Sequence, residues 1–95
     1  MFWCKIHKTK GEIIVAVCDK SLLGKRIGKK LKVHINENFY KGELVNEERV
    51  LELIKKSTIC NLIGKETVKI AVEKKFITKK NIMFIDDTPH AQIIC

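Results

Sequence analysis

The sequence predicts a single small α+β domain over residues 1–95, in which a mixed or antiparallel sheet is packed on one face by two helices. Strand-like patterns lie toward both ends of the chain, two helical patterns lie between them, and 45% of the residues are apolar. That apolar content is enough for one modest core. The longest apolar run has six residues, far short of the roughly 18 that a bilayer requires. We therefore expect a soluble, cytoplasmic protein with no membrane partner.

A β-hairpin is predicted at the start of the chain. Phe2, Cys4 and Ile6 alternate with Trp3, Lys5 and His7, which is the period of a strand with one buried face. Residues 9–11 supply a turn that contains glycine, and residues 12–18 form the second strand. Because residues 13–18 are all apolar, we expect this second strand to be central and covered on both faces.

The next segment changes character twice. Residues 20–28 contain Gly24 and Gly28, each of which weakens a helix by about 1 kcal/mol, so a short helical turn followed by a loop is expected. Residues 30–35 then alternate, and this pattern predicts a strand of the sheet with a basic outer face. Its inner side would carry Leu31, Val33 and Ile35, and its outer side Lys30, Lys32 and His34.

Two helices and two further strands complete the prediction. Residues 39–43 suggest a short extended piece, after which Asn46 caps a helix to about Lys56. A second helix runs from Glu66 to residues 74–75, with Asn61 and Gly64 interpreted as helix-boundary residues. Residues 82–85 predict a buried strand, residues 86–89 a turn, and residues 91–95 a final strand.

The charge is unevenly distributed along the chain. Residues 1–34 carry nine Lys/Arg and two acids, whereas residues 35–95 carry ten and nine. We call residues 20–32 the basic segment, because six basic residues and no acid lie there. This density is typical of a surface that meets a polyanion, although a solvated face that keeps the protein soluble is an alternative. The six are Lys20, Lys25, Arg26, Lys29, Lys30 and Lys32.

These charges predict a non-enzymatic RNA-binding protein. The basic segment would contact backbone phosphates, and specificity would come from the shape of the RNA. Ribosomal or transfer RNA is the expected partner, together with ribosomal or other ribonucleoprotein components. The basic surface would be extended by Lys5, Lys8, Lys10 and His34.

A different function class remains open at Asp86, Asp87 and His90. Carboxylates and an imidazole at the end of a strand suit acid–base chemistry, although Asp, Thr and Pro also build turns. The alternative is a small enzyme or anionic-ligand-binding protein, and its mark would be a concave pocket joining these residues to Lys25 or Lys29. A second alternative is an assembly protein that binds an acidic protein.

No metal site and no cofactor are expected. Cys4 and His7 have ligand-like spacing, but residues three apart in a strand point to opposite faces. The four cysteines form no Cys-x-x-Cys pair, so we expect reduced and mostly buried thiols. Trp3 could stack on a base, but packing against the core is the favoured interpretation.

Four short strings also resemble a known family. They are residues 17–25, beginning Val17-Cys18-Asp19, then Phe39-Tyr40-Lys41-Gly42-Glu43, Asn61-Leu62-Ile63-Gly64 and Pro89-His90-Ala91-Gln92. In this order they are similar to a small archaeal family, domain of unknown function four-twenty-four, whose members are often labelled predicted RNA-binding proteins. The resemblance implies an archaeal cytosolic protein associated with translation or the ribosome. It implies no catalytic residues.

Overall fold

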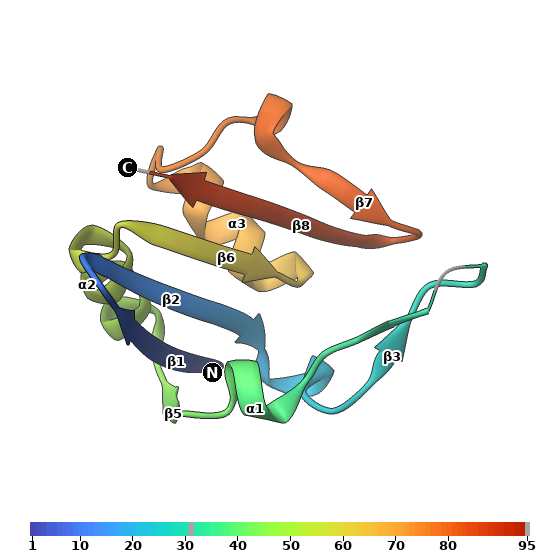
Figure 1. The fold of residues 1–95 in the computed structure, drawn as a ribbon. Helices are drawn as coiled ribbons and strands as arrows, with labels where there is room; N and C mark the ends of the chain where they lie inside the picture. Colours follow the sequence, from blue (N-terminus) through green and yellow to red (C-terminus); the bar gives the residue numbers. More distant parts are fainter. Residues whose placement is uncertain (31, 95) are drawn as a thin grey trace.

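A six-stranded mixed sheet forms the centre of the molecule in the computed structural model, which describes residues 1–30 and 32–94 (Figure 1). The strand order is β5-β1-β2-β6-β8-β7, and only β2 and β6 are parallel neighbours. This arrangement confirms the predicted α+β class and mixed sheet. The strands of this sheet are β1 (Phe2–Thr9), β2 (Glu12–Asp19), β5 (Glu43–Val45), β6 (Ile59–Ile63), β7 (Met83–Ile85) and β8 (Thr88–Ile94).

The predicted N-terminal hairpin is confirmed. β1 and β2 pair antiparallel from Phe2 opposite Asp19 to Thr9 opposite Glu12, and Gly11 takes a positive φ of 73° in the turn. β2 lies between β1 and β6, and its residues from Val15 onward are buried. A central strand covered on both faces explains why its side chains are apolar without alternation.

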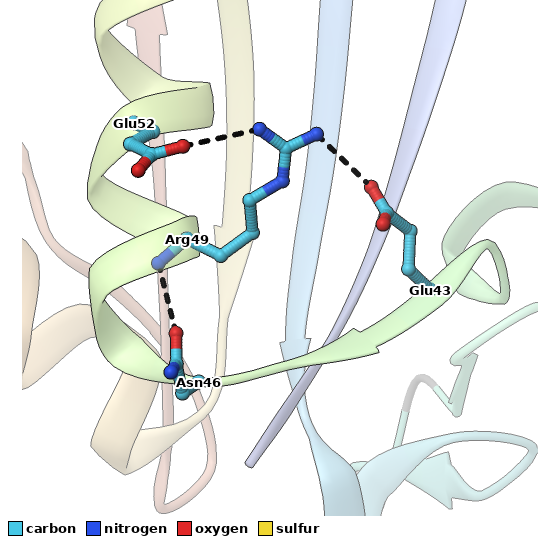
Figure 2. Close-up of polar contacts among 4 residues, drawn as sticks. All are labelled: Glu43, Asn46, Arg49 and Glu52. Atoms are coloured by element: carbon cyan, nitrogen blue, oxygen red, sulfur yellow. Dashed lines mark hydrogen bonds and ion pairs between the residues drawn. The ribbon is translucent and has the colours of Figure 1, made fainter.

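The two predicted helices are also confirmed, on one face of the sheet. α2 (Glu47–Lys56) begins where Asn46 Oδ1 accepts a hydrogen bond from the Arg49 backbone N–H at 3.0 Å (Figure 2). α3 (Lys65–Glu73) follows β6, and apolar residues of both helices join one core with β1, β2, β6 and β8. Among the residues described, no helix combines the length and the apolar character that crossing a membrane requires.

Strand β6 was not expected from the sequence. Asn61 lies at the middle of this strand, so its assignment to a helix boundary is wrong, whereas Gly64 does precede α3. The polar Asn61 interrupts the apolar pattern of this five-residue strand. An apolar pattern this short, lying between two helical patterns, resembles a loop that connects two helices. Pairing with β2 on one side and β8 on the other makes this segment the centre of the sheet.

A smaller core covers part of the opposite face of the sheet. There α1 (Glu37–Tyr40) packs on Ala16, Cys18 and Ile63. The residues that join it from the preceding segment are Leu22, Leu23, Ile27 and Ile35. The expected extended piece at residues 39–43 is therefore wrong at Phe39 and Tyr40, which lie in α1. A cap at Asn36, whose Oδ1 accepts from the Asn38 backbone N–H at 2.7 Å, turns the chain into this short helix.

The strand expected at residues 30–35 does not belong to the main sheet. η1 (Lys20–Leu22) confirms the predicted short helical turn. Among the described residues, β3 (Arg26–Ile27) then pairs with β4 (Val33–His34) and with no strand of the main sheet. The edge strands of the main sheet are β5 and β7. The backbone groups of β3 and β4 pair with each other and not with either of these edges. Leu31, predicted on the inner side of the strand, lies outside the described residues.

The C-terminal strands differ from expectation in burial and in length. β7 is an edge strand in which Met83 and Phe84 are 70% and 67% exposed, so the prediction of a buried strand is wrong. Its apolar residues suggested a core position, but among the described residues no strand pairs with its outer edge. The turn is confined to Asp86 and Asp87, and β8 begins at Thr88, three residues before the expected start.

Candidate nucleic-acid interface

The β3–β4 hairpin carries most of the basic segment and projects from the body of the protein (Figure 1). Arg26 lies directly opposite His34, and Ile27 lies opposite Val33. Directly opposite residues of an antiparallel pair share a face, so Arg26 and His34 lie together on one side. Both are exposed, whereas Ile27 and Val33 are half-buried. The hairpin therefore has a basic face and an apolar face.

The base of this hairpin is fixed to the protein. The Gly24 N–H donates to the Ile35 carbonyl at 2.8 Å, and the Ile35 N–H donates to the Lys25 carbonyl at the same distance. Ile35 is 1% exposed and belongs to the smaller core, against which Ile27 also packs. The basic face is thus presented by an anchored stem.

The charges of the basic segment are free of neutralising partners in the described structure. All six Lys/Arg side chains are exposed. The ion pairs found among the described residues both involve Arg49, which bonds Glu43 and Glu52 at the start of α2 (Figure 2). The hydrogen bond that Arg49 donates to the Glu52 carboxylate raises the pKa of Arg49. Because the acids of that network belong to β5 and α2, the positive charge of the hairpin remains available to a partner.

The remaining basic residues of the predicted surface are dispersed. Lys5 is half-buried, and its Nζ donates to the Asn38 carbonyl at 2.8 Å. Lys8 and Lys10 lie at the turn between β1 and β2, whereas the basic segment follows Asp19 at the other end of β2. At about 3.4 Å per residue, these ends are roughly 20 Å apart. The structure therefore groups His34 with the basic segment and separates Lys8 and Lys10 from it.

Asp86, Asp87 and His90 occupy three different environments. Asp86 lines a cleft of about 380 Å³ together with Lys29 and Lys30. Asp87 lines a separate hollow against α3. His90 is half-buried in β8, where burial lowers its pKa. Within the described residues no hydrogen bond or ion pair joins the three. Asp86 is the one of the three that shares a described pocket with lysines of the basic segment.

The structure reveals a role for Asp19 that the sequence analysis missed. Its carboxylate is 8% exposed and accepts from the Glu66 N–H at 3.1 Å and from the Thr67 N–H and hydroxyl at 2.8 and 2.7 Å. A Cβ at Gly64 would lie 2.3 Å from this carboxylate. Asp19 thus joins the end of β2 to the first turn of α3. An acid directly after a buried strand was the available signal.

The described cysteines of β1, β2 and β6 lie in the core, and His7 of β1 packs on an aromatic ring. Cys4, Cys18 and Cys60 are buried, and burial raises the pKa of Cys4 and of Cys18 to about 12. His7 points to the face opposite Cys4 and stacks on Phe39 with ring centroids 4.9 Å apart. No group of three or more His, Cys, Asp or Glu residues suited to a metal occurs in the described part of the chain. Cys95 lies outside that part.

Trp3 packs against the smaller core, which confirms the favoured interpretation of this residue. The Nζ atom of Lys41 lies 5.8 Å from the centroid of its ring. The Trp3 residue is half-buried, and its contact with Lys41 links β1 to the segment that follows α1. Trp3 therefore belongs to the packed region that supports the base of the hairpin.

The four strings of the family resemblance come together at one end of the sheet. Asp19 contacts Gly64, and the Gly64 N–H donates to the Pro89 carbonyl at 3.0 Å. Ile63 pairs with His90, and Tyr40 belongs to the same small core as Ile63. This end of β2 leads directly into η1 and the basic segment. The residues of the four strings therefore build the part of the fold from which the hairpin projects.

Comparisons with known proteins agree with this architecture. The family model described as "Protein of unknown function (DUF424)" matches residues 7–95. The crystal structure of an uncharacterized conserved protein from Methanopyrus kandleri superposes with a TM-score of 0.80 at 24% identity, covering 97% of this chain and 89% of that one, and it shows the same fold. A search of curated proteins gives no match. Since the family model spans nearly the whole chain, the protein belongs to the DUF424 family of proteins of unknown function.

Proposed function

We propose that this protein binds RNA without catalysing a reaction, and that the basic face of the β3–β4 hairpin contacts the phosphate backbone. One observation carries the proposal: six exposed Lys/Arg side chains, none in an ion pair among the described residues, lie on or beside a hairpin whose base is hydrogen-bonded to the protein. Each phosphate neutralised by such a side chain releases counterions and favours association.

The anchoring of the hairpin is the reason to prefer a binding role over solubility alone. A basic patch that serves only solubility needs no fixed shape, whereas the basic segment has a paired stem with Ile35 buried at its base. A projecting two-stranded element can follow the surface of a nucleic acid and place several cations against its phosphates. Arg26 and His34 form one such pair of neighbouring contacts.

The choice of RNA, and of ribosomal or transfer RNA in a cytoplasmic translation complex, rests on the resemblance to an archaeal family often labelled RNA-binding. The charge of the basic segment indicates only that the partner is negatively charged and that its charge is dense. A non-enzymatic role is supported by the separation of Asp86, Asp87 and His90 into different environments.

A second candidate is the binding of a small anionic ligand in the cleft that joins Lys29 and Lys30 to Asp86. Its volume of about 380 Å³ lies at the lower end of the range of about 300–1,000 Å³ typical of small-molecule sites. The cleft contains one acid beside its two lysines, which weakens its attraction for a compact anion. Thermal-shift screening with nucleotides and phosphorylated metabolites would identify such a ligand.

Charge reversal tests the RNA proposal. Changing Lys25, Arg26, Lys29 and Lys30 together to Glu should abolish binding to host RNA while leaving the melting temperature nearly unchanged. A matched control changes four other exposed residues by the same total charge, and it should retain most of the affinity. The control residues are Lys55, Lys56, Lys74 and Lys75.

The measurement is purification of tagged protein from its native host at low and high salt, followed by sequencing of the bound nucleic acid. A defined ribosomal or transfer RNA that the reversal variant loses and the control variant keeps would support the proposal. Equal RNA recovery with both variants would contradict it. A protein partner that persists after nuclease treatment would instead support the acidic-partner alternative.

A further inference from the structure

Phe84 is an exposed aromatic residue shared by two hollows. On the hairpin side it lines the cleft of about 380 Å³ with Lys29, Lys30 and Asp86. It also lines a hollow of about 340 Å³ bounded by α3, η2 (Lys79–Asn81) and β8. Phe84 therefore borders open space toward two different parts of the protein, and the residue is 67% exposed.

Lysines from three separate elements surround these hollows. Lys29 and Lys30 come from the hairpin loop, Lys65 and Lys69 from α3, and Lys79 from η2. Lys65, Lys69 and Lys79 belong to residues 35–95, where basic and acidic residues are nearly equal in number. The distribution of charge along the sequence therefore did not predict their place in a basic surface. The fold brings them to the same aromatic residue as the basic segment.

We infer that Phe84 is a stacking platform for an unpaired RNA base, whose flanking phosphates contact Lys29 and Lys30 on one side and Lys65, Lys69 and Lys79 on the other. Proteins that bind single strands combine aromatic side chains with a basic path for the backbone, and every base offers a face that can stack. The inference rests on the proposed function and deepens it. It narrows the RNA to an unpaired segment, which is a single strand, a loop or a bulge.

The acids beside Phe84 are consistent with a base as the occupant. Asp86 lies in the hairpin-side cleft, and Glu73 and Asp87 lie in the other hollow. A carboxylate accepts hydrogen bonds from the exocyclic amino group of a base, as it does from cytosine N4. Five lysines against three acids leave a positive balance for the phosphates. An acidic peptide would have to place its own carboxylates against these acids.

Met83 provides a matched control for Phe84. It is the neighbouring residue in β7 and is equally exposed, at 70%, but it is absent from the linings of both hollows. Successive residues of a strand point to opposite faces, and Met83 pairs with His90 whereas Phe84 pairs with Pro89. Replacing either exposed side chain should preserve folding, which equal melting temperatures would verify.

The experiment measures affinity by fluorescence anisotropy for two probes. One is a labelled single-stranded RNA of mixed sequence, and the other is the same strand annealed to its complement. F84A should weaken single-strand binding roughly 5- to 150-fold, the loss typical of one stacked base, and should change duplex binding far less. F84W should restore single-strand affinity, F84L should not, and M83A should match the wild type.

The outcomes separate this inference from the proposed function. If Lys29→Gln and Lys30→Gln weaken both probes while F84A changes neither, RNA binding stands and base stacking at Phe84 is overturned. If F84L binds the single strand as tightly as the wild type, an apolar contact has replaced stacking and the inference also fails. If the wild-type protein binds neither probe at low salt, the proposed function fails and this inference fails with it.

Discussion

The six-stranded sheet and the β3–β4 hairpin are built on different physical grounds. The sheet packs α2 and α3 over one continuous core that includes Val17, Leu62 and Ala71. The hairpin has two residue pairs of its own among the described residues, and it depends on Ile35 and Ile27, which pack into the smaller core. Stability is therefore concentrated in the sheet, whereas the unpaired charge that a partner would meet is concentrated in the hairpin.

The largest effect on stability is expected in the sheet, from L62A. Leu62 is 0% exposed in β6, so truncation removes buried apolar surface and leaves a cavity that costs about 2–5 kcal/mol. I94A is the control, since Ile94 lies in the neighbouring strand at 73% exposure and should change stability by less than about 0.5 kcal/mol. Urea denaturation measures both, and equal losses would contradict a core centred on β6.

A smaller loss is expected at the junction of the two regions, from D19A. The change removes the acceptor for the Glu66 and Thr67 N–H groups and for the Thr67 hydroxyl, which should cost about 1.5–3 kcal/mol. D19N keeps one carbonyl oxygen and should lose less. Hydrogen exchange should show faster exchange in the first turn of α3. Unchanged protection there would mean that Asp19 does not hold this turn.

A pH-dependent effect, smaller again, is expected at His90. Burial lowers its pKa below the ordinary value of 6.5, so the unfolded chain binds a proton more readily than the folded protein. The free energy of unfolding should therefore be highest above pH 6.5 and fall as the pH drops below it. H90Q should reduce this dependence. Identical profiles for H90Q and the wild type would contradict the prediction.

The smallest effect on stability is expected in the hairpin. Changing Lys29 and Lys30 to Gln should alter the free energy of unfolding by less than about 0.5 kcal/mol, because both side chains are exposed and unpaired among the described residues. The slope of log affinity against log salt should fall by about two, roughly one for each lost phosphate contact. A clear loss of stability with an unchanged slope would reverse the assignment of stability to the sheet and binding to the hairpin.

Strong local patterns were sufficient to predict much of the sheet. The alternation in β1 and the glycine turn at residue 11 specify the first hairpin because register and burial agree over eight paired positions. Asn46 predicted the start of α2 because a side-chain oxygen satisfies an N–H that the helix leaves unpaired. The predicted hairpin charges were also correct as exposed residues, since lysine is costly to bury without a partner.

Local patterns did not predict the short strands β6 and β7 correctly. β6 has five residues with Asn61 at its centre, and only its neighbours β2 and β8 make it a strand. Phe84 is apolar and lies in a strand, so burial was expected, but its place at the edge of the sheet leaves it exposed. In both residues the deciding contact, or its absence, is with an element distant in the chain.

The sequence by itself determined the α+β class, the first hairpin, both long helices and the basic character of residues 20–32, because each depends on local periodicity, capping or composition. Tertiary structure decided that residues 26–34 form a separate hairpin, that Lys8 and Lys10 lie at the far end of β2, and that Lys65 and Lys69 lie near Phe84. These are relations between distant segments, and they are fixed by how the strands pair and which faces the helices cover.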